Sequence, residues 1–306
     1  VWLDKIAGQE VRKTIFDPLM DIKYGLPSSA LSANWLGSRL HYQEFSKPLG
    51  FIAGTDWTKI LNEKLAEKVR ELGGIILTNA QVTKINLNND KFESLEYVMD
   101  SGLRRNDSIN SIAGDILINT TPPHIFLKLT SQTAKATAST QYTEPQLEKI
   151  EYLDALSLIL ETEQKLPREL YLLSCLKPRY SFGGIFMLSS LNKTIGTKNG
   201  TVINFFTTLS SGSEYLRYKS ADELLKIYSR DFEKLFGFEP KPIWHHLTLI
   251  KNYSPKFLNG YENPQIQGSI KNIYFAGNYL TYPIITSTGS ALESGEMAAN
   301  LVINNY

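Results

Sequence analysis

The stretch Lys271–Tyr306, KNIYFAGNYLTYPIITSTGSALESGEMAANLVINNY, decides the fold of this chain. Its apolar and aromatic segment Asn272–Ala276 predicts a short buried strand, which ends at Gly277 and Asn278 because both residues tolerate a positive φ. A loop rich in Ser and Thr follows, and an amphipathic helix begins near Gly289. A strand, a glycine turn and a helix N-terminus in this order are typical of dinucleotide sites, since helix amides and the helix dipole attract electron-rich groups.

Small residues recur along one face of this helix. Ala291, Gly295 and Ala299 are spaced four residues apart, so they share a face. Two interpretations stay open from the spacing alone: the helix packs tightly on a sheet, or its backbone lies close to a ligand.

The two segments that flank the Ser- and Thr-rich loop resemble a known signature. IYFAGNYL (273–280) and TSTGSALESGEMAANLV (286–302) are similar to the C-terminal FAD-binding signature of the flavin amine oxidase superfamily, which includes amine oxidases, phytoene desaturases and protoporphyrinogen oxidases. The nearest subgroup is the protoporphyrinogen-oxidase-like oxidoreductases. Asn278 departs from the commoner acidic residue of the signature, although an amide can still hydrogen-bond a ribityl hydroxyl or a phosphate.

The resemblance implies FAD as the cofactor and assigns roles to five residues. Gly277 and Asn278 would lie near the link between ribityl chain and phosphate. Backbone N–H groups around Ser290 and Ala291 would face the pyrimidine oxygen. Gly295 would sit where a missing side chain allows close approach, so that Gly295→Leu would overpack the helix face.

The resemblance extends backward from the C-terminus. GFIAGTDWTKILNEKLAEKVRELGGIILTNAQVTKI (50–85) predicts a helix over Trp57–Leu72, followed by strand pieces at Ile75–Leu77 and Val82–Ile85. The resemblance implies that Val82 touches the adenine through its backbone, while its pattern alone is that of a core strand residue.

A second element, GDILINTTPP (114–123), resembles the segment that returns the chain to the cofactor domain, with a strand at Asp115–Asn119 and Thr121 near the edge of that domain. We expect this strand to share a sheet or layer with the 75–85 and 272–276 strands.

The expected fold is α/β: a partial, Rossmann-like FAD-binding domain interrupted by an α+β substrate domain with a mixed sheet and helices. Residues 1–50 form the helical part of the substrate domain, 51–130 the second part of the FAD-binding domain, 131–265 the rest of the substrate domain, and 266–306 the C-terminal strand and helix. The polar stretches 101–111 and 130–143 predict loops.

The superfamily begins with a strand, a G-x-G-x-x-G loop and a helix that bind the ADP half of FAD. This sequence contains no G-x-G-x-x-G. We therefore expect the C-terminal part of a longer flavoprotein or one product of a split gene; a truncated pseudoenzyme is the alternative. The chain alone should bind FAD weakly, and a separate N-terminal polypeptide would complete the site. Without that polypeptide, apolar surface should be bare on Ile116, Ile118, Ile273 and Phe275.

Composition limits the remaining possibilities. The 306 residues are 42% hydrophobic and 21% charged, with a net charge of +1, which indicates a folded globular chain without a nucleic-acid footprint. The single cysteine, Cys175, excludes an internal disulfide and fits a reducing compartment, so we expect a cytoplasmic protein in which Cys175 is buried. No run reaches the ~18 apolar residues of a membrane helix.

Signals for other chemistry are absent from the sequence. None of the four histidines has a metal-binding spacing, and neither a G-x-S-x-G elbow nor a P-loop occurs. No catalytic residue can be assigned, which is compatible with flavin chemistry because the cofactor carries the hydride. The expected reaction removes a hydride from a C–N or C–C bond of an unknown small molecule. The alternative is a non-catalytic remnant or binding module.

Tyrosines supply the candidate substrate pocket. Tyr282 lies in the loop that runs beside the isoalloxazine in the superfamily, and Tyr253 and Tyr261 are alternatives. The competing interpretation is that these tyrosines pack between domains with their hydroxyls in water.

Overall fold

The computed structural model describes residues 2–44, 52, 54–99, 108–134, 144–166, 170–175, 180–197, 200–210, 212–284 and 286–306. The chain forms two compact units. The first comprises residues 1–65 and 152–259, and the second comprises residues 66–151 and 260–306. Each unit is therefore built from two separate stretches of the chain.

The first unit contains a five-stranded antiparallel sheet in the order β6-β7-β8-β5-β9. The strands are β5 (Tyr152–Thr162), β6 (Leu172–Ser174), β7 (Gly184–Met187), β8 (Thr201–Thr208) and β9 (Pro242–Pro255). Runs of apolar and β-branched residues predict strands over Ala155–Glu161, Thr201–Thr207 and Trp244–Ile250, which β5, β8 and β9 confirm within a few residues. Apolar periodicity also predicts a helix over Ala221–Leu235.

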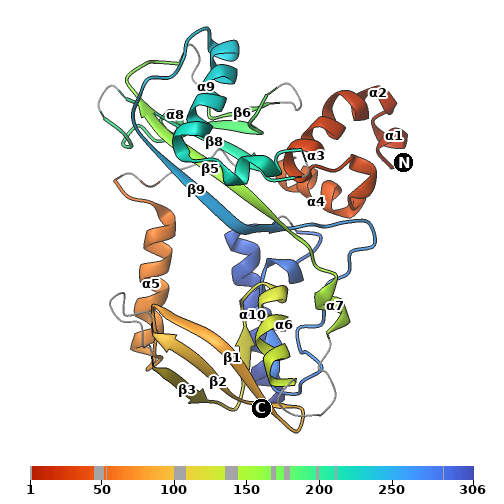
Figure 1. Ribbon diagram of the computed structural model, residues 1–306. Coiled ribbons are helices and arrows are strands. Elements are labelled where there is room, and N and C mark those ends of the chain that lie inside the picture. The colour runs from red at the N-terminus through yellow and green to blue at the C-terminus, as the bar shows by residue number, and fades with distance from the viewer. Residues whose placement is uncertain are drawn as a thin grey trace. The chain divides into compact units, whose positions relative to one another are not determined.

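Helix α9 (Ala221–Phe236) covers one face of this sheet, as Figure 1 shows. It begins with a capping box between Ser220 and Glu223, and it ends at Gly237, whose φ of 80° suits glycine. Leu224, Tyr228 and Phe232 lie on its buried side and are fully enclosed with the sheet residues of the core. The predicted helix over Ala221–Leu235 is confirmed.

The N-terminal stretch of the first unit is helical. Its elements are α1 (Trp2–Ile6), α2 (Gln9–Val11), the π-turn η1 (Arg12–Phe16), α3 (Asp17–Tyr24), η2 (Ser28–Ala30) and α4 (Ala33–Glu44). Helix α3 packs on β8 and ends at Gly25, where an added Cβ would lie 2.0 Å from the Ser210 side chain. Tyr24 and Trp35 meet edge to face, with their ring centroids 5.2 Å apart.

Helix α5 (Trp57–Glu71) carries the boundary between the units. None of its residues is buried, and Leu65 and Val69 are 45% and 42% exposed. Beyond it, Leu72 and Ile75 are 77% and 85% exposed. The predicted strand over Ile75–Leu77 is absent, since these residues have no strand pairing. The sequence also predicts a short strand over Phe51–Ile52; Phe51 falls outside the described residues, and Ile52 is not in a strand.

The second unit contains an antiparallel sheet in the order β1-β2-β3, formed by β1 (Ala80–Asn88), β2 (Lys91–Met99) and β3 (Ile109–Ala113). Strand β3 occupies part of the stretch 101–111 that was predicted as a polar loop. Residues 101–107 of that stretch fall outside the described residues, as do residues 135–143 of the second predicted loop, 130–143.

The second unit also contains a parallel pair, β4 (Leu117–Asn119) with β10 (Ile273–Phe275). This pairing confirms the prediction that the 115–119 and 272–276 strands share a sheet. The 75–85 stretch of the same prediction is not in that sheet, because its only strand is β1 of the β1-β2-β3 sheet. Asn272 ties the pair to β2: its side chain accepts from the Phe92 N–H at 2.7 Å and donates to the Phe92 and Asp115 carbonyls at 2.9 and 2.7 Å.

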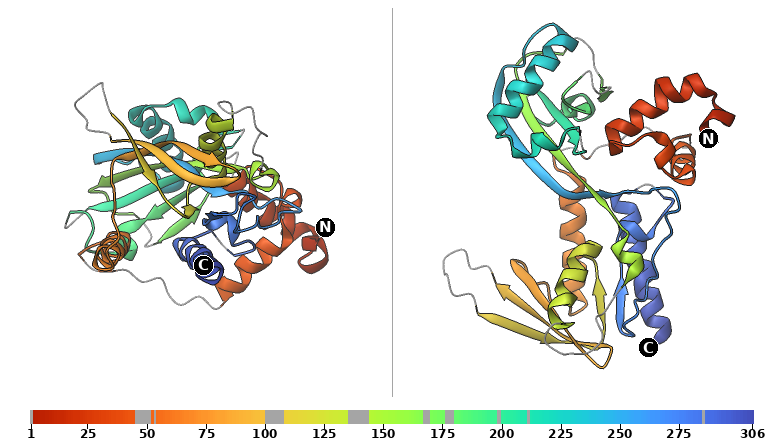
Figure 2. Two further views of the ribbon diagram at one scale, coloured as in Figure 1. Left: turned by 90° about the horizontal axis from the view of Figure 1, so that it is seen from below. Right: turned by 45° about the vertical axis from the view of Figure 1, so that its right-hand side comes forward.

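Helices α6 (Pro123–Ala134) and α10 (Thr288–Asn305) lie on opposite faces of the β4–β10 pair, as Figures 1 and 2 show. The rings of Phe275 and Phe126 of α6 meet edge to face with their centroids 4.9 Å apart. The side-chain amide of Asn305 of α10 donates to the hydroxyl of Tyr274 at 3.1 Å. The short elements α7 (Pro145–Glu148) and η4 (Asn278–Leu280) complete this unit, and α8 (Leu188–Leu191) and η3 (Glu214–Tyr218) complete the first.

The prediction of bare apolar surface is wrong for two of its four residues. Ile273 and Phe275 are 0% and 1% exposed, because β10 is covered on both faces by its own unit. Ile118 on β4 is 39% exposed and Ile116 is half-buried. None of the described helices is long and apolar enough to span a membrane.

Candidate functional site

The carboxyl ends of β4 and β10 form the candidate site. Both strands run in the same direction, so the residues that follow them meet at one edge, where open α/β sheets bind their ligands. Thr121 follows β4, and Gly277 and Asn278 follow β10. The structure therefore brings together these three residues of the predicted cofactor site.

Gly277 makes a turn that no larger residue fits. Its φ is 157°, and an added Cβ would lie 2.5 Å from the ring of Tyr279. Its N–H donates to the Ser294 hydroxyl at 2.8 Å, and that hydroxyl donates to the Ala291 carbonyl at 2.6 Å. The end of β10 is thereby fixed to the first turns of α10.

Thr121 and Asn278 border this turn. The Thr121 hydroxyl donates to the Asn119 side chain at 2.8 Å, and the Asn119 amide donates back to the Thr121 carbonyl at 3.2 Å. The Asn278 carbonyl accepts from the Thr281 hydroxyl at 3.1 Å.

The N-terminus of α10 has its own cap. Ser287 and Ser290 form a capping box, in which the Ser290 N–H donates to the Ser287 hydroxyl at 3.1 Å. The Ala291 N–H donates to the Ser287 carbonyl at 3.1 Å. The amides of Ser290 and Ala291 thus already have acceptors within the chain, which corrects the expectation that they are available to a ligand.

Two other amides at this helix end have no acceptor among the described residues. They belong to Thr288 and Gly289, the first two residues of α10. The sequence-based prediction did not include these two amides because it placed the helix start one residue late, near Gly289. Ser287 and Ser290, three residues apart, are a capping-box pattern that indicates the observed start. A helix N-terminus with two such amides can hold an electron-rich group.

Gly295 does not lie on the buried face of α10. That face is formed by Ser290, Ser294 and Ala298, while an added Cβ at Gly295 would meet no atom within 4 Å. The room for a Cβ gives no support to the expectation that Gly295→Leu overpacks this chain, and the effect of a whole leucine side chain at this half-buried position stays a prediction. The predicted face, Ala291, Gly295 and Ala299, is offset by one residue from the buried face. Both faces have small residues at four-residue spacing, so the spacing alone could not tell which of them is buried.

Val82 lies in β1, in the other sheet of the second unit, where it is half-buried opposite Tyr97. Its predicted adenine contact stays a prediction.

The candidate pocket tyrosines fall in different units. Tyr282 and Tyr261 of the second unit are paired with ring centroids 5.3 Å apart, beside the glycine turn: the Tyr261 hydroxyl donates to the Tyr279 carbonyl at 2.6 Å. Tyr253 belongs to β9 of the first unit, where its ring lies 5.1 Å from that of Phe206.

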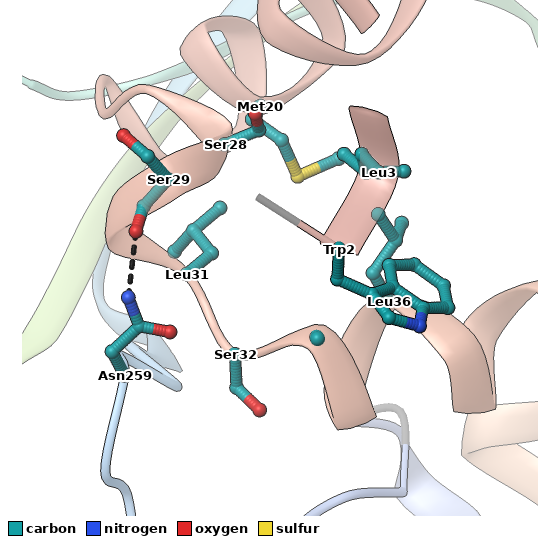
Figure 3. A pocket seen from close by; sticks show the side chains of 10 residues that line it. Trp2, Leu3, Met20, Ser28, Ser29, Leu31, Ser32, Leu36 and Asn259 are labelled. Carbon is teal, nitrogen blue, oxygen red and sulfur yellow. Dashed lines mark hydrogen bonds between the residues drawn. The ribbon is translucent and has the colours of Figure 1, made fainter. Parts of the chain in front are cut away.

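Cavities occur in both units. One of about 240 Å³ lies among the N-terminal helices of the first unit, and Figure 3 shows its mostly apolar wall, which includes Leu3, Met20, Leu31 and Leu36. The other, of about 470 Å³, lies in the second unit between α7 and the segment that precedes β10.

Metal and thiol chemistry find no support in the described part of the chain. Its residues contain no group of three or more His, Cys, Asp or Glu side chains that could hold a metal ion. Cys175 is 2% exposed, and burial raises the pKa of its thiol to about 12, as expected for a structural cysteine.

Comparison with solved structures shows a shared fold. A candidate protoporphyrinogen oxidase from Exiguobacterium sp. 255-15 is 15% identical with a TM-score of 0.65, and 99% of this chain covers 66% of that chain. Reduced UDP-galactopyranose mutase is 14% identical with a TM-score of 0.69, over 98% of this chain and 66% of that chain. Cyclohexylamine oxidase from Brevibacterium oxydans IH-35A is 10% identical with a TM-score of 0.57, over 99% and 66%.

The chain thus spans 66% of the length of these three structures. No curated protein sequence matches it. The sequence model of one family, described as flavin containing amine oxidoreductase, matches residues 2–303. A match over nearly the whole sequence shows that this chain belongs to the flavin-containing amine oxidoreductase family.

Proposed function

We propose that this chain is part of an FAD-dependent oxidoreductase that removes a hydride from a C–N or C–C bond of a small molecule. The observation that carries the proposal is the edge formed by the Gly277 turn and the N-terminus of α10. There the amides of Thr288 and Gly289, which have no acceptor among the described residues, leave two donors on the helix that Ser294 joins to the Gly277 turn. Family membership implies a flavin, and this edge fits one.

Each residue of the edge has a role toward the cofactor in this proposal. Thr288 and Gly289 donate to the pyrimidine end of the ring system, taking the place first assigned to Ser290 and Ala291. Asn278 and Thr121 face the ribityl–phosphate part, where an amide and a hydroxyl can each donate and accept. The bound flavin supplies the hydride acceptor.

The phosphate half of the cofactor needs donors that this sequence lacks, because it has no G-x-G-x-x-G. We propose that a further polypeptide segment, either in the same protein or separate, supplies them by adding a strand to β4. One edge of the β4–β10 pair is already covered, since residues Ile266 and Gly268 hydrogen-bond to β10.

The other edge belongs to β4 and has no strand partner in the described residues. Leu117 and Asn119 direct their backbone groups to β10, so the N–H and C=O of Ile118 point to the open edge. The side chain of Ile118 is 39% exposed on the same strand. An unpaired strand with an exposed apolar side chain is a template for strand addition.

The test is a flavin titration. The purified 306-residue chain is mixed with FAD, alone and with the polypeptide encoded immediately upstream, and flavin fluorescence and visible absorption are recorded. We expect weak binding by the chain alone and stoichiometric binding by the pair. The variant Gly277→Val should abolish binding by the pair, whereas Lys226→Met, on the exposed side of α9, should not change it.

Two results would contradict the proposal. Tight binding by the chain alone would mean that the phosphate site is built from its own residues. A stable pair that binds no flavin would instead favour the alternative function, a non-catalytic binding module that keeps the fold.

A further inference from the structure

Four residues of the first unit form a cluster of hydrogen-bond donors and positive charge. Lys23 and Tyr24 end helix α3, Arg39 lies on α4 and Tyr253 lies on β9. Arg39 is close enough to the other three residues for its charge to act on each of them. The Lys23 amine is 4.9 Å from the centroid of the Trp35 ring and 5.6 Å from that of Tyr24. The two aromatic rings hold the amine in place by cation–π attraction.

The cluster contains two cations without a carboxylate partner. Neither Lys23 nor Arg39 forms an ion pair with any described acidic side chain, although most of the other half-buried cations of this unit do, as Arg12 does with Asp4 and Arg217 with Asp154. Burial and, second, the charge of Arg39 lower the pKa of the Lys23 amine to about 7. Two like charges held together are unfavourable unless an anion compensates them.

The cluster also contains buried donors without acceptors. The hydroxyl of Tyr24 and the indole N–H of Trp35 are both buried, and neither has a hydrogen-bond partner among the described residues. Buried polar groups are nearly always paired, so each such group needs an explanation. Tyr253, 38% exposed, connects the cluster to solvent.

An apolar cavity lies on the same two helices as Tyr24 and Arg39, one helical turn away from them along the sequence. Met20 and Leu36 line the cavity of about 240 Å³ in Figure 3, and Tyr24 and Arg39 follow them by one helical turn on the same helices. Apolar surface near two cations and unpaired donors suits an anionic head group on an apolar body.

We propose that Lys23, Tyr24, Arg39 and Tyr253 form a binding site for the anionic group, a carboxylate or a phosphate, of a small organic ligand. The site would select a substrate that carries an acidic group and reject a purely cationic amine. That the ligand is the substrate of a flavoenzyme rests on the function proposed above; the anion site itself does not.

The proposal is tested by calorimetric titration of the 306-residue chain with three probes of similar size: benzoate, phenyl phosphate and benzylamine. We expect saturable binding of at least one anion and none of benzylamine; the better anion identifies the head group. Because no flavin is added, failure of this experiment is distinct from failure of the proposed oxidoreductase function.

Matched variants locate the site. Arg39→Gln and Lys23→Met should each weaken anion binding on the order of 10- to 100-fold, the loss expected for a charged hydrogen bond. Tyr24→Phe should weaken it on the order of 5-fold without lowering the melting temperature, because the hydroxyl has no partner in the empty site. The exposed Lys226→Met is the control for charge. Two results would overturn the proposal. In the first, benzoate and phenyl phosphate bind no better than benzylamine; in the second, anion binding is unchanged in both Arg39→Gln and Tyr24→Phe.

Discussion

At the scale of single residues, Gly277 has the least tolerance for change. An alanine Cβ there would lie 2.5 Å from the Tyr279 ring, at a φ of 157° that L-residues rarely adopt. We expect Gly277→Ala to lower the free energy of unfolding by about 1–3 kcal/mol. Gly295→Ala, with open space at its Cβ, should have little effect or stabilise α10 by up to about 1 kcal/mol. Urea unfolding followed by circular dichroism measures both, and equal midpoints would show that the turn is not constrained.

Lys23 predicts a dependence of stability on pH. Its folded-state pKa of about 7 lies below the ordinary value of 10.5, so the unfolded chain binds more protons between these values. The free energy of unfolding contributed by this group should therefore rise as the pH rises through that window, by about 1–2 kcal/mol after allowance for solvent screening. Urea unfolding at pH 7 and pH 9.5 tests this. The increase in the free energy of unfolding between pH 7 and pH 9.5 should be smaller in Lys23→Met than in the control Lys226→Met. The same increase in both variants would contradict the prediction.

Cys175 predicts low thiol reactivity. It is 2% exposed and its pKa is raised to about 12, first by burial and second by the nearby Asp231. The thiolate is the reactive species, so almost none is present near neutral pH. A chromogenic disulfide reagent should label less than one tenth of the native protein in the time needed to label the urea-unfolded chain completely, an order-of-magnitude expectation. Rapid labelling of the native protein would show that this part of the sheet opens readily.

At the scale of elements, the seam between β10 and α10 depends on one hydroxyl. Ser294 is 1% exposed and accepts from the Gly277 N–H at 2.8 Å. Ser294→Ala would leave a buried N–H without an acceptor, so we expect a loss of about 1–3 kcal/mol in the free energy of unfolding. Ser131→Ala, at an exposed helical serine of α6, is the control and should be nearly neutral. A neutral Ser294→Ala would indicate that another acceptor replaces the hydroxyl.

The open face of α10 gives a variant that separates folding from assembly. Since an added Cβ at Gly295 meets nothing, Gly295→Leu should keep the wild-type melting temperature of this chain. If the further polypeptide segment proposed above packs on that face, Gly295→Leu should lower its affinity for this chain at least on the order of 10-fold, as overpacking at an interface does. Analytical ultracentrifugation of the pair measures this, with Glu296→Gln as a control on the exposed side.

Elements with a strong local pattern could be predicted from the sequence, and elements that depend on a partner could not. Helix α9 and strands β5, β8 and β9 were predicted because apolar periodicity and caps specify them locally. Ile75–Leu77 has the composition of a strand, but a strand exists only when another pairs with it. The buried side of α10 was misassigned because small residues recur every four positions on two neighbouring faces, and Ser290, Ser294 and Ala298 form the buried one.

The site shows the same division. Thr121 lies at the same edge as Gly277 and Asn278 because parallel strands end together, and the contact of these residues with a cofactor stays a prediction. The amides without an acceptor, those of Thr288 and Gly289, were placed two residues too late, at Ser290 and Ala291. Burial of Phe275 was missed because it depends on Phe126, which is distant in the sequence.

At the scale of the whole molecule, the exposed apolar residues of the second unit predict association. Leu72 and Ile75, three residues apart in the chain, are 77% and 85% exposed, and Ile109 is 69% exposed. We expect the chain alone to bind a hydrophobic dye and to self-associate at micromolar concentration. The further polypeptide segment proposed above should suppress both the dye binding and the self-association. The double variant Leu72→Gln, Ile75→Gln should reduce dye binding without changing the melting temperature. Unchanged dye binding would show that the exposed hydrophobic surface is formed by other residues.

The discontinuity of the second unit sets the order in which the molecule can form. Strand β4 pairs with β10, yet Leu117 and Ile273 are separated by the whole of the five-stranded sheet of the first unit. During synthesis that sheet is complete before β10 leaves the ribosome, so it can fold while β4 still waits for its partner. Asn272, which joins Phe92 and Asp115, is also made late. The last step of folding is therefore the closing of the β4–β10 edge. A nascent chain arrested when Lys271 but not Asn272 has left the ribosome tunnel should carry a protease-resistant first unit and a protease-sensitive second one.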